Sequence, residues 1–297
     1  MIRRRARGGP SGDVPDRFAE PALKLHGEEG PAPLPPPPAA RLAPELLATP
    51  RPGEVHVLGP VEVPGLAPRR LRVYLPRAWT PGERRALLLT FDGQNLFDDE
   101  PSHAGGWHLH QAVEKLGARG WPAPIVAGID HGGEERIAEL SPFPIGRREG
   151  KLDLLLDWVV EGLLPVLASS YRLAPSPAGT VVGGSSMGGL AALYAHFRHP
   201  EAFGGALALS PSLWVAEGAL FTELAARATP AVSRIYLDCG AREGRGTAQP
   251  LVAELADQLA RRGYGPDRLL WRCDPRGAHN EASWRRRLPR ALRFLFR

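Results

Sequence analysis

The stretch 180–190 (TVVGGSSMGGL) constrains this chain more than any other part of its sequence. It begins as a short apolar run typical of a buried strand, turns through small residues and continues as an Ala- and Leu-rich run typical of a helix. Gly184, Ser186 and Gly188 match G-x-S-x-G, a sharp strand-to-helix turn that exposes its serine. We expect glycines here because side chains would collide with the neighbouring strand and helix. The same turn leaves the Met187 amide free to donate to a developing oxyanion.

The G-x-S-x-G pattern alone is a weak signal, because the chain contains 34 glycines. The alternative is an ordinary tight turn without chemistry. The apolar strand before the pattern and the helix after it favour the turn that exposes a serine, which we call the elbow. Ser185 is the competing nucleophile, but a pattern centred on Ser185 lacks the second glycine.

The amino-acid composition limits the classes of protein to which this chain can belong. The chain has 297 residues, 43% hydrophobic and 23% charged, which suits one large α/β domain with a sizeable core. Two cysteines are too few for a disulfide framework. Cys239 and Cys273 should each end a late strand, so they could be neighbours, and we interpret them as small buried hydrophobic residues.

No targeting or membrane signal is apparent. There is no uninterrupted apolar run of about 18 residues, so no membrane span is expected. The basic N-terminus lacks the apolar segment of a secretory signal, which makes the cytoplasm the default location.

The net charge of +5 is concentrated at the end of the chain. Apolar residues there recur at helical spacing, which predicts an amphipathic helix with a solvated basic face. No aromatic platform or recognition motif accompanies the charge, so nucleic-acid binding is not expected. The arginines are Arg285, Arg286, Arg287, Arg290, Arg293 and Arg297.

Two parts of the chain differ in composition. Twelve of the 32 prolines fall in residues 1–52, where aliphatic residues are sparse, so this part is predicted to be a disordered tail with polyproline II character. The tail is either a passive extension, which we favour, or a partner-binding arm. Residues 53–297 are predicted to form the folded domain.

The folded part alternates between predicted strands and helices. Two alternating patterns come first and predict antiparallel strands. Later apolar runs predict strands buried on both faces of a mostly parallel central sheet, with helices covering both faces, and hence an α/β fold. The strands are expected at 54–58, 61–63, 70–75, 86–91, 124–130, 180–182, 203–210, 235–240 and 269–273, and the helices at 106–116, 152–167, 190–196, 215–228, 251–259 and 284–295.

Polar loops follow several of these strands, at the edge where α/β sheets bind ligands. After strand 86–91, Gln94 is the candidate for a second oxyanion amide and Gly93 comes next, although a capped turn with Asp92 or Asn95 is a compatible interpretation. In the loop after strand 124–130, Arg136 and Glu139 either form a structural ion pair, which we favour, or touch substrate.

Two further features of the sequence bear on ligands. The segment 210–214, which ends at Trp214, should line the pocket. Two histidine pairs could suggest a metal site, but the first pair would point apart on a helix and the second is interpreted as solvated at a helix end. The sequence therefore predicts no metal site. The pairs are His108 with His110, and His196 with His199.

A serine nucleophile needs a histidine base, and the histidine needs an acid to orient it. In folds that use this elbow the chain order is serine, acid, histidine. His279 is the sole histidine after the last predicted strand, and its alternative role is a helix N-cap. Glu243, three residues after a turn glycine, is the preferred acid. Asp238 lies inside a strand and Asp274 follows the wrong strand.

Taken together, the elbow, the loop 92–98, the loop 128–139 and the segment 279–284 resemble the putative esterase group of α/β-hydrolases. That group includes enterochelin (ferric-siderophore) esterases and has esterase D-type thioesterases, feruloyl esterases and mycolyltransferases as relatives. The resemblance covers about residues 53–297. It implies an α/β-hydrolase fold, with Ser186 as nucleophile, His279 as base and Glu243 as acid. It also implies oxyanion amides from Met187 and the Gln94 region.

The expected function is hydrolysis of a siderophore-like or other small carboxylic ester through an acyl-enzyme, without a metal or organic cofactor. Gly93, Arg136 and Trp214 are the expected substrate-binding residues. Arg136 and Arg242 near the mouth of the site favour an anionic substrate. An acyltransferase of the same fold and a non-catalytic scaffold that binds partners through its Pro-rich arm are the alternatives.

Overall fold

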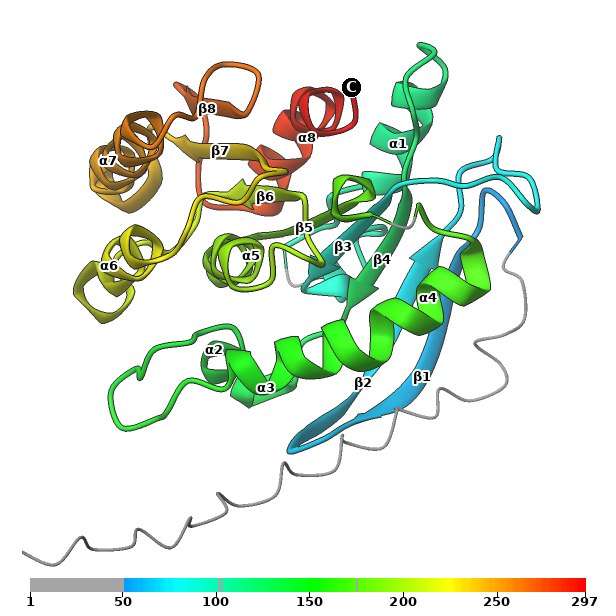
Figure 1. Cartoon of the computed structure of the whole chain (residues 1–297), viewed down its shortest axis with the longest axis horizontal. Helices are drawn as coiled ribbons and strands as arrows, with labels where there is room; N and C mark the ends of the chain where they lie inside the picture. Colours follow the sequence, from blue (N-terminus) through cyan, green and yellow to red (C-terminus); the bar gives the residue numbers. More distant parts are fainter. Residues whose placement is uncertain (1–50, 101, 103, 175) are drawn as a thin grey trace, which may run out of the picture. The chain divides into compact units, whose positions relative to one another are not determined.

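One eight-stranded sheet forms the centre of the computed structural model, which describes residues 51–100, 102, 104–174 and 176–297 (Figure 1). The predicted tail at residues 1–52 lies almost entirely outside the described residues. In the order of the sheet the strands are β1 (Val55–Val63), β2 (Leu66–Tyr74), β4 (Ile125–Ile129), β3 (Leu87–Phe91), β5 (Thr180–Ser185), β6 (Gly205–Leu209), β7 (Arg234–Gly240) and β8 (Leu269–Asp274).

The strand directions confirm the predicted sheet. β1 is antiparallel to β2 and β2 is antiparallel to β4, whereas the remaining neighbours are parallel. Every residue of β3, β4, β5 and β6 is buried. Their apolar runs therefore form strands because both faces are covered by helices, as parallel sheets require.

The helices lie in two layers (Figure 1). Side chains of α1 and α8 share one apolar cluster on one face of the sheet, and side chains of α3, α4, α5, α6 and α7 share a second cluster on the other face. The helices are α1 (Leu109–Gly117), α2 (Arg136–Glu139), α3 (Leu152–Asp157), α4 (Leu164–Tyr171), α5 (Met187–Arg198), α6 (Ala219–Ala226), α7 (Ala248–Arg261) and α8 (Glu281–Leu295).

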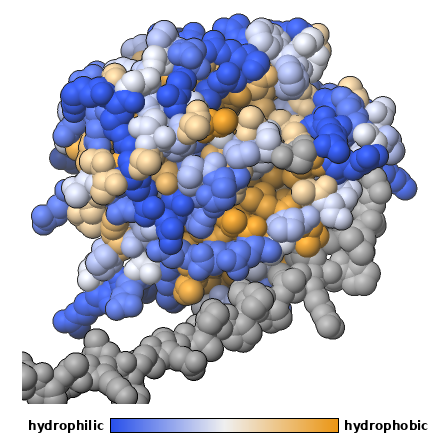
Figure 2. All heavy atoms as spheres, in the orientation of Figure 1, coloured by the Kyte–Doolittle hydropathy of each residue, from blue (hydrophilic) through white to orange (hydrophobic). Residues whose placement is uncertain are grey.

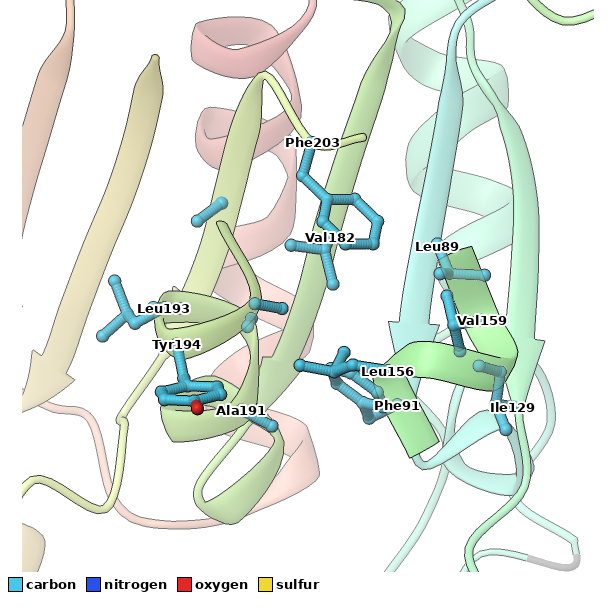
Figure 3. Close-up of a cluster of buried hydrophobic side chains, with 14 of the residues drawn as sticks. Leu89, Phe91, Ile129, Leu156, Val159, Val182, Ala191, Leu193, Tyr194 and Phe203 are labelled. Atoms are coloured by element: carbon cyan, nitrogen blue, oxygen red, sulfur yellow. The ribbon is translucent and has the colours of Figure 1, made fainter. Parts of the chain in front are cut away.

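The second cluster is the larger part of the core. In Figure 3, Leu156 and Val159 of the α3–α4 region lie beside Leu89, Phe91 and Ile129 of the central strands. The predicted helix 152–167 is therefore correct in position, although it extends to Tyr171 and widens into a π-helical turn at Trp158–Leu163.

Three details differ from the sequence expectations or refine them. The predicted helix 215–228 is broken, because Ala216 and Glu217 have positive φ angles before α6 begins. Cys239 and Cys273 are direct neighbours in the β7–β8 register and both are free thiols; Cys239 is buried, whereas Cys273 is half-buried. His196 was expected to be solvated, but it is fully buried.

The parallel strands all end at the same edge of the sheet. Their carboxyl ends lead into Gly93–Asn95 after β3, the elbow after β5, Glu243–Gly246 after β7 and the loop before α8. This arrangement brings residues from distant parts of the sequence to one place. Among the residues that the structure describes, no helix has the length and apolar character needed to cross a bilayer.

Candidate active site

Ser186 occupies a strained turn between β5 and α5. Its φ of 57° and ψ of −120° lie outside the regions that a serine ordinarily adopts. The Ser186 amide donates to the Leu209 carbonyl at 2.9 Å and its own carbonyl accepts from the Ser212 amide at 3.0 Å, so β6 and the loop after it hold the turn. A Cβ on Gly184 would lie 2.5 Å from the carbonyl carbon of Gly188, which explains why position 184 has no side chain.

Ser186, His279 and Glu243 form a hydrogen-bonded chain. His279 Nε2 lies 2.9 Å from Ser186 Oγ, and His279 Nδ1 lies 3.2 Å from Glu243 Oε2. A carboxylate only accepts, so the proton belongs on Nδ1 and Nε2 is left to accept from the serine hydroxyl. The three side chains come from the loops after β5, β8 and β7, which is the spatial arrangement that the sequence order predicts.

Glu243 is buried in a set of hydrogen-bond donors. Its Oε1 accepts from the Gly240 amide at 2.7 Å and from the Ser210 hydroxyl at 2.7 Å, and lies 3.5 Å from Arg287 Nη1. Burial alone would raise the pKa of Glu243, but the hydrogen bonds from His279, Ser210 and Gly240 together hold it below its ordinary value. The carboxylate is therefore ionised and its Oε2 is free to orient the imidazole.

A second layer supports the acid. Ser210 Oγ accepts from Trp284 Nε1 at 2.9 Å and from Arg287 Nη2 at 2.8 Å. Arg287 Nε also lies 3.0 Å from Asp238 Oδ2, and Asp238 Oδ1 accepts from the Ser210 amide. Complete burial raises the pKa of Asp238 to about 7, against the lowering effect of Arg287. Asp238 thus packs behind Glu243, in the structural role expected for it.

His279 stands two residues before the start of α8. Asn280 caps this helix, since its side chain accepts from the Ser283 amide at 3.0 Å, so the alternative role of His279 as the N-cap is wrong. The imidazole meets the Trp284 ring edge-on, with centroids 5.1 Å apart. The His279 side chain is 43% exposed, and water can therefore reach the base.

Two backbone amides near Ser186 are available to an oxyanion. Met187 is the first residue of α5, and Gln94 is the second residue of the 3₁₀ turn Gly93–Asn95, where helix geometry leaves the first amides without an internal acceptor. The Gln94 side chain accepts from the His131 amide at 3.2 Å and so ties this turn to the loop after β4.

A polar cleft of about 430 Å³ opens beside Ser186. Four of the predicted site residues line it, namely Gln94, Arg136, Ser186 and His279. The complete lining is Gln94, Asn95, Ala104, His131, Arg136, Ser185, Ser186, His279, Asn280, Glu281 and Trp284.

Gly93 and Trp214 are not brought to this cleft. Gly93 packs against Gly128, where a Cβ would lie 2.7 Å from the carbonyl carbon, so it brings β3 and β4 close together. Trp214 is 65% exposed and is absent from the lining. Its segment nevertheless contributes to the site, because Ser210 contacts Glu243 and Ser212 Oγ lies 3.3 Å from Ser186 Oγ.

Arg136 forms an ion pair, but not with the predicted partner. Its guanidinium binds both oxygens of buried Asp92, at 2.6 and 2.7 Å, whereas Glu139 is paired with buried Arg69 at 3.0 Å. Periodicity could not reveal this, because Asp92 and Arg136 are 44 residues apart. The Asp92 pair fixes the loops after β3 and β4 on either side of the cleft and largely neutralises the one arginine in its lining.

Among residues 51–297 as far as the structure describes them, no group of three or more His, Cys, Asp or Glu side chains is placed to hold a metal ion.

Comparison with known proteins identifies relatives over most of the described domain. The family model described as Putative esterase matches residues 67–295. The chain is 21% identical over 242 residues to the uncharacterised protein YbbA of Bacillus subtilis (strain 168), covering 77% of this chain and 92% of that protein. It is 33% identical over 191 residues to the iron(III) enterobactin esterase of Dickeya dadantii (strain 3937), covering 62% of this chain but 39% of the longer relative.

Solved structures agree with this relationship. The enterobactin esterase FES from Shigella flexneri, solved in the presence of 2,3-dihydroxy-N-benzoyl-glycine, has a TM-score of 0.64 and 25% identity; the match covers 83% of this chain and 61% of that chain. The BES protein from Bacillus cereus has a TM-score of 0.64 at 20% identity, covering 82% and 94%, which supports the fold alone.

Proposed function

The chain belongs to the Putative esterase family of α/β-hydrolases and is a hydrolase of carboxylic esters, and from this we propose that it cleaves its substrate through an acyl-enzyme formed on Ser186. The observation that carries the proposal is the hydrogen-bonded chain from Ser186 Oγ through His279 to Glu243. A serine hydroxyl is a poor nucleophile at neutral pH, and such a chain activates it.

In the first half of the reaction, Ser186 Oγ attacks the ester carbonyl while His279 Nε2 takes the hydroxyl proton. The resulting imidazolium is stabilised by ionised Glu243. The negative oxygen of the tetrahedral intermediate accepts from the amides of Met187 and Gln94. His279 then returns its proton to the departing alcohol, and the acyl group remains on the serine.

In the second half, water attacks the acyl-enzyme while His279 takes its proton; the bond between the acyl group and Ser186 Oγ then breaks, His279 returns the proton to Ser186 Oγ, and the carboxylic acid is released. The exposure of His279 favours hydrolysis over acyl transfer, because a transferase must keep water from its acyl-enzyme. This observation ranks the acyltransferase alternative below the hydrolase.

We propose a small ester with polar substituents as the substrate. The cleft has the volume of a small-molecule site, and polar or charged residues make up nine of its eleven lining residues, beside Ala104 and Trp284. Relatives are named iron(III) enterobactin esterase and iron(III) salmochelin esterase, so esters of the siderophore type are the first class to test. Because Asp92 already neutralises Arg136, we expect the cleft to select by shape and hydrogen bonding rather than by attraction of an anion.

The test compares the parent with Ser186→Ala and with Ser169→Ala, a matched change on an exposed face of α4. Each protein is treated with a fluorophosphonate probe and assayed with a short-chain nitrophenyl ester. We expect labelling of the parent and of Ser169→Ala, loss of labelling in Ser186→Ala, and a fall in kcat of about 10⁴-fold or more. Peptide mass spectrometry distinguishes Ser186 from Ser185 as the labelled residue.

Turnover by Ser186→Ala close to the parent rate would refute the assignment. A folded parent that neither takes the probe nor hydrolyses esters would instead favour the scaffold alternative. Active parent protein then allows catecholate and feruloyl esters to be compared for the substrate.

A further inference from the structure

A second cleft, separate from the one beside Ser186, lies between the edge strand β8 and helix α8. It has a volume of about 470 Å³. Its lining is strongly basic, with five arginines and one acidic residue. The residues are Tyr236, Arg272, Cys273, Asp274, Pro275, Arg276, Arg286, Arg287 and Arg290.

Two of these arginines are already matched by carboxylates. Arg287 is buried and contacts Asp238 at 3.0 Å and Glu243 at 3.5 Å, which lie behind the cleft. Arg286 Nη2 lies 3.1 Å from Asp274 Oδ2. The charges of Arg286 and Arg287 are therefore neutralised by carboxylates within the fold.

The other three arginines form an unbalanced group. Arg272, Arg276 and Arg290 are exposed, and none has a carboxylate oxygen within 4.0 Å among the described residues. They come from the strand β8, from the loop after it and from α8, so three separate elements direct positive charge at one concave site. Like charges gathered in this way repel one another, and an anion bound between them would offset that repulsion.

The lowered pKa of Asp274, the one acidic residue in the lining, is consistent with a positive electrostatic potential in this cleft. Partial burial would raise the pKa of Asp274, but the Arg276 amide, the Arg286 guanidinium and the charge of Arg287 hold it below its ordinary value. Figure 2 shows hydrophilic side chains over much of the upper part of this face, with apolar side chains exposed between them, in the region where α7, β8 and α8 lie in Figure 1.

We propose that the cleft between β8 and α8 is a binding site for a small multivalent oxyanion, a polyphosphate or polycarboxylate group of about three negative charges. Guanidinium groups bind both kinds of group through paired N–H donors. The site is concave and has a volume in the range of small-molecule pockets, which favours a small ligand over an extended nucleic-acid strand.

The proposal does not depend on the esterase mechanism. The three unbalanced arginines are not in the lining of the cleft beside Ser186. Binding can therefore be measured without turnover, and either proposal can fail without the other.

The experiment titrates pyrophosphate, and separately citrate, into the full chain by calorimetry at constant ionic strength. The test variant is Arg272→Gln with Arg290→Gln. Arg261→Gln is the matched control, because Arg261 is an exposed arginine on α7 outside the cleft. Loss of a hydrogen bond to a charged group weakens binding by about tenfold, so the double variant should bind about 100-fold more weakly than the parent.

We expect one equivalent of anion on the parent and on Arg261→Gln. Preference for pyrophosphate assigns the site to phosphoryl ligands, and preference for citrate assigns it to polycarboxylates. Absence of saturable binding to the parent at millimolar anion, or equal binding by parent and double variant, would overturn the proposal. Should the double variant unfold, Arg276→Gln in the exposed loop gives the same test with one charge removed.

Discussion

Ser210→Ala is the sharpest test of how Glu243, the proposed acid of the triad, is held in place. The Ser210 hydroxyl donates to Glu243 Oε1 and accepts from Trp284 Nε1 and Arg287 Nη2, so its one proton and both lone pairs are in use. Alanine removes all three bonds and leaves their buried partners in place. Position 210 has a φ of 46°, which serine and alanine tolerate equally, so backbone strain does not change.

The expected cost follows from the kinds of bond lost. Two of them involve charged groups, at about 1.5–3 kcal/mol each, and one is neutral, at about 1 kcal/mol. Their sum would be about 4–7 kcal/mol, but bonds within one network are not additive. Glu243 also keeps the Gly240 amide and Arg287 keeps Asp238. We therefore expect a loss of about 2–4 kcal/mol in the free energy of unfolding.

Urea unfolding measures this loss, with Ser212→Ala as the matched control. Ser212 is a buried serine two residues away whose side chain makes one polar contact, to Ser186 Oγ, so its replacement should cost about 1 kcal/mol or less. Ser210→Ala should also lower kcat more than it changes KM, because Glu243 loses a donor that keeps it ionised and in place. Equal unfolding free energies for the two variants would refute the reasoning.

Three further outcomes follow from the structure. Gly184→Ala should destabilise the fold by about 1–3 kcal/mol and abolish probe labelling. Gly188→Ala should be tolerated better, because its Cβ would lie 3.4 Å from its nearest neighbours. Equal losses of unfolding free energy for the two variants in urea would contradict this. Asp92→Asn should cost about 3 kcal/mol, because Arg136 loses its carboxylate, and a thermal midpoint equal to that of the parent would argue against it. The pKa of Glu243 is lowered in the folded protein from an ordinary 4.5, so its contribution to stability is present above pH 4.5 and is lost as the pH falls below that value. The difference in unfolding free energy between the parent and Glu243→Gln should therefore shrink with acidification. A difference that stays constant with pH would contradict the shift.

The fold could be predicted from the sequence because its signals are local. Continuous apolar runs identified the buried strands, and alternation identified β1 and β2 as the antiparallel pair. The break at Ala216 and Glu217 could not be predicted, since neither residue type favours positive φ and only the tertiary structure imposes it. His196 was also missed, because its burial depends on partners at Phe203 and Ser233 in other elements.

The contact between Ser186, His279 and Glu243 could be predicted from the sequence, because the chain order of an elbow-containing fold restricts where each residue can lie. The contacts that support these three residues could not be predicted from the sequence. The Asp92–Arg136 pair joins two loops, and the Ser210 network joins four elements, so no pattern within one segment encodes either. The two elbow glycines look equivalent in the sequence, yet a side chain would meet backbone at Gly184 and only ordinary contacts at Gly188.

In helix α8, the helical spacing of the residues could have predicted that Arg287 is buried. Trp284, Leu288 and Ala291 mark its inward face by their spacing, and Arg287 falls on the same face because it lies three residues after the tryptophan. All six arginines at this end of the chain were expected on a solvated basic face, but Arg287 lies at an inward position, where a buried guanidinium needs carboxylate partners, and it contacts Asp238 and Glu243. The same helix thus directs Trp284 and Arg287 toward Ser210 and Glu243, and it places the outward Arg286 and Arg290 in the lining of the basic cleft, where Arg286 is paired with Asp274. When the helical period is applied to the charged residues as well as to the apolar ones, it separates the inward Arg287 from the outward Arg290, which has no carboxylate within 4.0 Å among the described residues.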